Sequence, residues 1–221
     1  MIKKNLKKRI FTSSVLFILV FLMISYNLVF ALSLIIMAAF SINEFYKILK
    51  KITKKKIYFW LFNILFSSYL ITTFIIFFYF SKDLLLKIIL FYFLFVCIIS
   101  DIGGFLFGNM FKGPKLTKIS PNKTISGSIG SLVLVTVFSM IFCNYLQIKP
   151  EHFFGITIIS LFTSIVCQVG DLSFSYLKRK AKIKDTGNIF PGHGGILDRL
   201  DGILLGVPVG FLLSYTYIYL S

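Results

Sequence analysis

The sequence predicts an all-α, polytopic integral membrane protein with about seven transmembrane helices, within a range of roughly six to eight. Three observations lead to this fold class. Only 14% of the 221 residues are charged, against about 25% in typical soluble domains. The mean hydropathy is +0.88. The apolar residues, including 27 phenylalanines, gather into long stretches, and lipid must solvate most of this surface because one small core cannot hold it.

Seven apolar stretches can be read as membrane spans, for which a helix needs about 20 apolar residues. The first two are short and joined only by "SYN", which favours a tight helical hairpin. The first follows a basic N-terminus but no small-residue cleavage site comes after it, so we expect a retained span. A single membrane-embedded domain over 1–221 is expected, because no internal repeat or linker is visible. The stretches are 10–25, 28–42, 58–80, 84–111, 126–146, 153–177 and 196–220.

Positive charges orient these spans. With the N-terminus in the cytoplasm, 21 of the 24 Lys and Arg residues fall inside, and only Lys82, Lys87 and Lys149 fall outside. The positive-inside rule describes this asymmetry, which indicates the cell (inner) membrane and an external C-terminus. Basic loops beside anionic lipid head groups also explain the net charge of +16, so no nucleic-acid partner is expected.

The three cysteines, Cys97, Cys143 and Cys167, are scattered within apolar stretches. An odd number at unrelated spacings indicates neither a disulfide framework nor a zinc site. We therefore expect buried free thiols.

The acidic residues carry more information because there are only eight. Four are expected in loops or at span ends: Glu44, Asp83, Glu151 and Asp185. The other four adjoin the cytoplasmic ends of apolar stretches: Asp101, Asp171, Asp198 and Asp201. A carboxylate at membrane depth costs about 2.5–3.5 kcal/mol on insertion scales, so each of these four is a functional candidate by default.

Helix capping is the simple alternative for Asp198. It does not suit Asp101 and Asp171, which follow long apolar runs and would lie near the negative end of a helix dipole. Something positive must compensate for the charges of these two carboxylates.

Asp198 and Asp201 are three residues apart, so on one helix they would share a face, with their Cβ atoms about 5–6 Å apart. Two like charges this close repel unless a cation lies near them. Mg²⁺ is the natural candidate, because carboxylates, phosphate oxygens and water suit it. Lys178, Arg179, Lys182 and Lys184, with the Gly-rich turn "PGHGG", are typical phosphate-binding groups. Together they indicate phosphoryl or nucleotidyl transfer on a lipid head group.

These residues resemble the signature of the phosphatidate cytidylyltransferase (CDP-diacylglycerol synthase) family. The segment "SYLKRKAKIKDTGNIFPGHGGILDRLD", 175–201, meets every fixed position of that pattern. The "SDIGG" segment with the "SPNKT" loop, and the "VGDLS" segment, agree as well. The resemblance covers roughly 95–215, the expected catalytic part, whereas 1–94 matches only as hydrophobic helices. The matched positions are Ser175, Lys178, Arg179, Lys184, Asp185, Gly187, Pro191, His193, Gly194, Gly195, Asp198, Arg199 and Asp201.

The resemblance implies transfer of CMP from CTP to phosphatidate, which gives CDP-diacylglycerol and pyrophosphate. It implies Mg²⁺ as the cofactor, with a second cation as an option, and Asp171 and Asp198 as the metal ligands. The implied catalytic residues are Asp171, Asp198, Asp201, Lys178 and Arg179. The implied substrate-binding residues are Asp101, Ser120, Lys123, Thr124, Lys184, His193, Gly194, Gly195 and Arg199.

For His193, a role as general base and a structural or phosphate-contacting role both stay open. The family further suggests a homodimer, and the charge asymmetry places the expected active site on the cytoplasmic side. Discrimination between CTP and dCTP and the acyl-chain preference stay open. Two positions depart from the family pattern, because Ser126 and Phe174 stand where acids are usual.

Two alternative functions compete with this one. "DRLDG" also fits the start of the CDP-alcohol phosphotransferase motif, but Ile-Leu-Leu-Gly follows and no further acid does, which excludes that family. The second alternative is a carboxylate-lined transporter or channel, with Asp101 and Asp171 as relay groups. It predicts paired half-length repeats, which are not visible, and it leaves the "PGHGG" turn unexplained.

Overall fold

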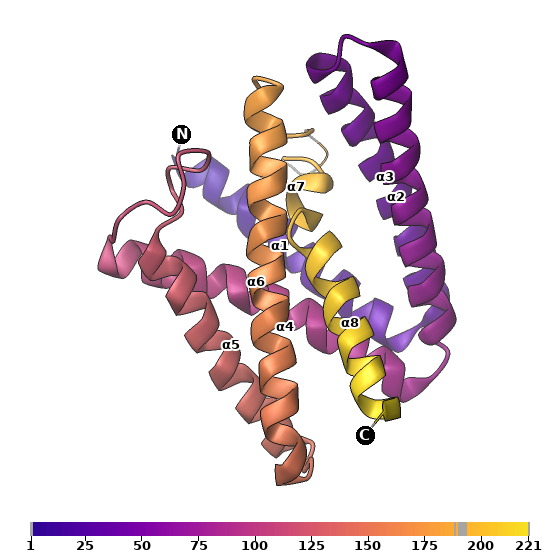
Figure 1. Ribbon diagram of the computed structural model, residues 1–221, viewed down its shortest axis with the longest axis vertical. Coiled ribbons are helices and arrows are strands. Elements are labelled where there is room, and N and C mark those ends of the chain that lie inside the picture. The colour runs from indigo at the N-terminus through magenta and orange to yellow at the C-terminus, as the bar shows by residue number, and fades with distance from the viewer. Residues whose placement is uncertain (1, 188, 190–193, 221) are drawn as a thin grey trace. The chain divides into compact units, whose positions relative to one another are not determined.

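The computed structural model describes residues 2–187, 189 and 194–220, and within these ranges the regular structure is helical. The prediction of an all-α fold is therefore confirmed. The helices, labelled in Figure 1, are α1 (Ile2–Ser25), α2 (Asn27–Ile52), α3 (Lys56–Phe80), α4 (Leu84–Phe111), α5 (Ile125–Tyr145), α6 (Pro150–Lys180), α7 (Leu197–Leu200) and α8 (Ile203–Leu220).

Six helical segments among the described residues are long and apolar enough to cross a membrane. They are α2, α3, α4, α5, α6 and the segment Leu197–Tyr219, which contains α7 and α8. A shorter apolar helix, Ser14–Ser25, forms the second half of α1. The polytopic membrane class is thus confirmed, and six spans fall within the predicted range.

The helix bounds follow the predicted spans, with two large differences: α1 begins at Ile2 instead of residue 10, and α2 extends past residue 42. The segment after residue 42 was expected to be a loop, but α2 continues to Ile52. Glu, Lys and Leu are strong helix formers, and Lys50 and Lys51 in the last turn complement the negative end of the helix dipole. The prediction that Glu44 lies in a loop or at a span end is therefore wrong.

The chain forms two compact units, and the first comprises Met1–Lys87 and Leu177–Leu200. Only Tyr26, in an extended conformation, separates α1 from α2, and the two helices contact each other as a hairpin requires. Helix α2 also contacts α3, beside which it runs in Figure 1, and α7. Its buried face carries Phe30, Leu34, Ser41, Glu44, Phe45, Ile48 and Leu49, spaced at three or four residues as on one side of a helix.

The second unit comprises Ile88–Tyr176 and Asp201–Ser221. It contains most of α4 and α6 together with α5 and α8. Hydroxyl groups join its helices: Ser100 Oγ is 2.7 Å from Ser164 Oγ, and Ser131 Oγ donates to the carbonyl of Ser100 at 2.6 Å. Because lipid supplies little hydrophobic drive between helices, such hydrogen bonds and close contacts of small residues hold the bundle together.

Asp101 and Asp171 lie inside helices and not at their ends. Asp101 belongs to α4, which continues to Phe111, and Asp171 belongs to α6, which continues to Lys180. The prediction that both lie near the negative end of a helix dipole is therefore wrong. Beyond Asp101, apolar residues and glycines continue α4 to Phe111, and beyond Asp171 polar and basic residues continue α6 to Lys180.

Candidate active site

Asp101 of α4 meets Cys167 and Asp171 of α6 in the second unit. One carboxylate oxygen from each aspartate and the Sγ atom of Cys167 all lie within 4.8 Å of one another. Cys167 is fully buried and Asp171 is 9% exposed. The structure thus brings together two of the predicted site carboxylates from different helices. Two carboxylates at this separation favour a cation beside them.

Lys123 is the positive group near Asp171 that the sequence analysis expected. Its Nζ atom is 2.8 Å from Asp171 Oδ2, and the two side chains are 31% and 13% exposed. Solvent screens such a partly buried pair much less than a surface pair. Lys123 was assigned to substrate binding from the resemblance, and its structural partner is a predicted metal ligand.

The loop between α4 and α5 fixes the position of Lys123. The Lys123 N–H donates to the Ser120 carbonyl at 3.0 Å, and its own carbonyl accepts from Leu116 at 2.8 Å. Thr124 is the N-cap of α5 and accepts from the Gly127 N–H at 3.1 Å. The structure therefore brings the predicted residues Ser120, Lys123 and Thr124 together in one short loop.

The two departures from the family pattern have other roles in this chain. Ser126 Oγ accepts from the Gly113 N–H at 3.3 Å and lies 3.1 Å from Thr124 Oγ1, so it braces the same loop. Phe174 is buried in α6, with 8% of its surface exposed.

Asp201 and Gly202 form a turn that packs against α6. A Cβ atom on Gly170 would lie 2.9 Å from the Asp201 carbonyl oxygen, and one on Gly202 would overlap the Asp171 carboxylate. Glycine at both positions thus lets the turn approach Asp171 closely. The expectation that Asp198 and Asp201 share one helix face is wrong, because α7 ends at Leu200 and the turn interrupts the helix before α8.

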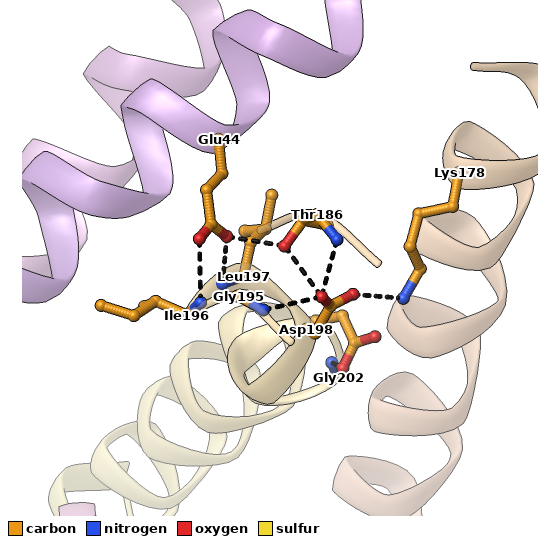
Figure 2. Close-up of polar contacts among 9 residues, drawn as sticks. Glu44, Lys178, Thr186, Gly195, Ile196, Leu197, Asp198 and Gly202 are labelled. Carbon is orange, nitrogen blue, oxygen red and sulfur yellow. Dashed lines mark hydrogen bonds and ion pairs between the residues drawn. The ribbon is translucent and has the colours of Figure 1, made fainter. Parts of the chain in front are cut away.

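In the first unit, Asp198 accepts hydrogen bonds from both ends of the loop 186–195, which we call the signature loop. Its Oδ2 atom accepts from the Thr186 N–H at 2.7 Å, the Thr186 hydroxyl at 3.0 Å and the Gly195 N–H at 3.0 Å. Figure 2 shows these contacts converging on one carboxylate oxygen. Asp198 therefore closes the loop between residues 186 and 195, a role beyond simple capping of α7.

Lys178, in the last turn of α6, pairs with the other oxygen of Asp198. Its Nζ atom is 2.8 Å from Oδ1, and the side chains of Lys178 and Asp198 are 14% and 7% exposed. An ion pair this deeply buried is costly to break, because the remaining charge loses its compensation. The structure brings these two predicted catalytic residues into direct contact.

Glu44 is a residue of this region that the sequence reasoning missed. Its carboxylate accepts hydrogen bonds from Ile196, Leu197 and Thr186, and the residue is 2% exposed. One signal could have found it: if α2 is extended past residue 42, Glu44 falls on the same face as Ser41 and Ile48.

The remaining predicted residues lie in or near the signature loop. Gly194 has φ +84°, in the left-handed region that glycine enters freely. Gly195 has no room for a Cβ atom, which would overlap the Glu44 carboxylate. His193 lies outside the described residues. The predicted residues Arg179, Lys184 and Arg199 are exposed, as are Lys180 and Lys182.

The three cysteines are free and buried, as predicted.

The chemistry of the two units is similar: in each, a poorly exposed aspartate pairs with a lysine. Carboxylate oxygens are hard donors that suit Mg²⁺, and lysine ammonium groups suit phosphate oxygens. This combination fits a charged phosphate substrate with a divalent cation.

Comparison with protein families identifies a match over most of the chain. The profile described as the cytidylyltransferase family matches residues 51–217. This range includes the "SPNKT" loop, all of α6 and the signature loop. It begins after Glu44.

Curated relatives with the name phosphatidate cytidylyltransferase are similar to part of the chain. The Rickettsia felis protein is 44% identical over 130 residues, which are 55% of this chain and 57% of the relative. The Bacillus subtilis protein is 41% identical over 126 residues, 55% of this chain and 46% of the relative. The Helicobacter pylori protein is 41% identical over 111 residues, 50% and 41% respectively. The chain thus spans about half the length of the curated relatives it matches.

Proposed function

Because this chain belongs to the cytidylyltransferase family, we propose that it transfers CMP from CTP to phosphatidate, giving CDP-diacylglycerol and pyrophosphate. The observation that carries the proposal is the signature segment 175–201, whose Lys178 and Asp198 pair at 2.8 Å while Thr186 and Gly195 close the loop on Asp198. The names of the relatives support the same reaction. They give no support to the alternative of a transporter or channel.

The reaction needs no covalent enzyme intermediate. A phosphatidate oxygen attacks the α-phosphorus of CTP in line, and a new P–O bond forms as the bond to the β-phosphate breaks. The electron pair of the broken bond leaves with pyrophosphate. The protein must therefore align the two substrates and neutralise their charge, and both effects lower the barrier.

The basic residues of the two units are suited to hold the phosphates. Lys178 and Lys123 are already directed at carboxylates in poorly exposed positions, where a phosphate oxygen would gain more from the same charge than in water. We assign Arg179, Lys184 and Arg199 to the same task because they lie within the signature segment. Asp101, Ser120, Thr124, Gly194, Gly195 and His193 complete the proposed binding residues, with Asp201 as support.

Asp171 and Asp198 are the proposed Mg²⁺ ligands. The donor chemistry fits: Asp171 has a second carboxylate, Asp101, within 4.8 Å, and Oδ1 of Asp198 pairs with Lys178 while Oδ2 accepts three hydrogen bonds. When bound, Mg²⁺ would stabilise the charge that develops on the CTP phosphates. A second cation beside Asp101 is compatible with this donor set.

We place the protein in the inner membrane, with the basic loops and the active site on the cytoplasmic side. The charge asymmetry of 21 cytoplasmic to three external cations supports this orientation. It requires α1, whose apolar half Ser14–Ser25 is shorter than the six other segments, to cross the bilayer as a seventh span. The homodimer that the family resemblance suggests is part of the same proposal.

A labelling experiment tests the reaction. The purified full chain is incubated in detergent with phosphatidate and CTP that is labelled at the α-phosphorus, and lipid extracts are separated. We expect label in a lipid that migrates as CDP-diacylglycerol. CTP labelled at the γ-phosphorus should instead label only pyrophosphate. Unlabelled lipid in the first arm, from protein that is folded and monodisperse, would overturn the proposal.

A further inference from the structure

Glu44 is a buried acid whose role the reaction as described leaves open. It lies on α2, is 2% exposed, and belongs to the part of the chain before the family match, which begins at residue 51. A buried carboxylate is costly unless donors compensate for the water it loses. The groups that donate hydrogen bonds to Glu44 therefore indicate its role.

Among the described residues, three donors contact the Glu44 carboxylate, and all three belong to the signature segment. Oε1 accepts from the Ile196 N–H at 3.1 Å, and Oε2 accepts from the Leu197 N–H at 2.8 Å and the Thr186 hydroxyl at 2.6 Å. In Figure 2, Glu44 reaches from α2 toward these groups. The glycines at 187 and 195 leave room for it, because a Cβ atom on either would press on the carboxylate.

Thr186 connects Glu44 to Asp198. Its hydroxyl lies 2.6 Å from Glu44 Oε2 and 3.0 Å from Asp198 Oδ2, so one proton is shared between two carboxylates. Asp198 in turn accepts from Lys178 at 2.8 Å. A continuous series of polar contacts thus runs from α2 through the two ends of the signature loop to the end of α6, within the first unit.

We propose that Glu44 is a positioning residue: through Thr186 and the amides of Ile196 and Leu197, it fixes the signature loop and the orientation of Asp198. The proposal rests on the proposed function, because Asp198 matters for CMP transfer only if the protein performs it. Glu44 itself touches no substrate in this role. Its effect on the rate is transmitted by the loop.

The first test separates positioning from stability. Glu44→Ala, Glu44→Gln and the matched control Asn43→Ala, an exposed neighbour on α2, are compared by melting temperature, kcat and KM for CTP well below the melting temperature. We expect Glu44→Ala to lower kcat at least about tenfold, and Glu44→Gln less, because a displacement of about 1 Å in such a site can cost about 10²-fold. Folded variants with kcat within about twofold of the wild type would overturn the proposal.

The second test uses the Thr186 hydroxyl. Thr186→Val removes it, whereas Thr186→Ser keeps it. We expect kcat near the wild-type value for the serine variant and a loss for the valine variant. The double variant Glu44→Ala/Thr186→Val should lose less than the product of the two single losses, because both act through one contact. Independent, multiplicative losses would contradict coupling through Thr186.

The third test does not depend on activity. Hydrogen exchange of the peptide that contains Ile196 and Leu197 should be faster in Glu44→Ala than in the wild type and in Asn43→Ala, because two amides lose their acceptor. Unchanged exchange would overturn the anchoring role. If the wild type makes no CDP-diacylglycerol, the proposed function and the catalytic part of the inference fail together, while the exchange result still decides whether Glu44 holds the loop.

Discussion

At the residue scale, Asp171 and Asp198 each combine a buried negative charge with one lysine. Lys123 and Lys178 both approach at 2.8 Å, and the aspartate side chains are 13% and 7% exposed. Such pairs gain little stability over apolar residues of the same size, but loss of one partner is expensive. We therefore interpret both pairs as functional charges that the fold keeps ready for phosphate and cation.

Lys178→Ala tests this interpretation for substrate binding. We expect a higher apparent KM for a phosphate-bearing substrate with part of kcat retained, because its contact is similar in the ground and transition states. The melting temperature should also fall, because Asp198 loses its cation; removal of one partner of a buried pair costs about 3–5 kcal/mol. Steady-state kinetics in detergent, with a thermal melt, measure both effects. An unchanged KM with a large loss of kcat would instead give Lys178 a role in the transition state alone.

At the element scale, two glycines of α6 differ in what surrounds them. A Cβ atom on Gly170 would meet backbone, the Asp201 carbonyl at 2.9 Å and the Gly202 Cα at 3.1 Å, whereas one on Gly155 would meet the ring end of Tyr217. Backbone in a packed turn cannot move away, but the end of a side chain can. Helix α6 therefore depends on Gly170 to keep the turn against Asp171.

Gly170→Ala and Gly155→Ala form a matched pair that tests this dependence. Both replace glycine by a better helix former in the same helix, a gain of about 1 kcal/mol at most. Overpacking at Gly170 should cost about 1–3 kcal/mol and reduce activity, whereas Gly155→Ala should stay near wild type in both. Melting temperature and CDP-diacylglycerol formation are the measurements. Equal behaviour of the two variants would show that the turn is not held by this close approach.

The helices could be predicted from the sequence because hydropathy is a local property. The span expected at 84–111 is α4 with the same bounds, and the stretch 58–80 became α3. The end of α2 was missed because charged residues can continue a helix beyond the apolar run. For the same reason Asp171 was expected at a helix end, whereas beyond Asp101 it is apolar residues and glycines that continue α4 to Phe111. The three-residue spacing of Asp198 and Asp201 also predicted one helix through both. The structure instead has a turn at Asp201 and Gly202, where Gly202 packs closely against Asp171.

Lys178 and Asp198 could be grouped from the sequence because both lie within one signature segment, and the structure places them in contact. Contacts between distant segments could not be predicted in this way. Glu44 and its partners are separated by 142 to 153 positions in the chain, and no local pattern links them. The partner of Asp171 was foreseen as a positive group, but only the folded loop identifies it as Lys123.

At the scale of the whole molecule, the proposed orientation in the membrane rests on the distribution of charge. The basic segments before α1, at the end of α2, between α4 and α5, and at the end of α6 would all face the cytoplasm. Most of the proposed active-site residues lie in or beside the last two of these segments. A nucleotide from the cytoplasm could therefore reach them without crossing the bilayer.

A reporter fused after Ser221 tests this topology. With α1 and the six other segments crossing, the C-terminus lies outside, so a reporter that works only in the periplasm should be active. The matched fusion in the loop between α2 and α3, for instance after Lys54, should be active only with a cytoplasmic reporter. Cytoplasmic activity at Ser221 would show that one of the segments does not cross, with α1 the first to examine.

The most direct test of the central claim is a Mg²⁺ titration of CTP-dependent CDP-diacylglycerol formation by the wild type, Asp171→Asn and Asp198→Asn, with thermal melts in parallel. Each substitution removes one charge with almost no change in volume. We expect the wild type to saturate with Mg²⁺ and both variants to lose at least about 10²-fold in rate, with partial recovery at high Mg²⁺. Both variants should stay folded at the assay temperature but melt at a lower temperature, because Lys123 or Lys178 loses its charged partner. Near wild-type rates for Asp198→Asn at limiting Mg²⁺ would contradict its role as a ligand and leave it as the residue that closes the signature loop.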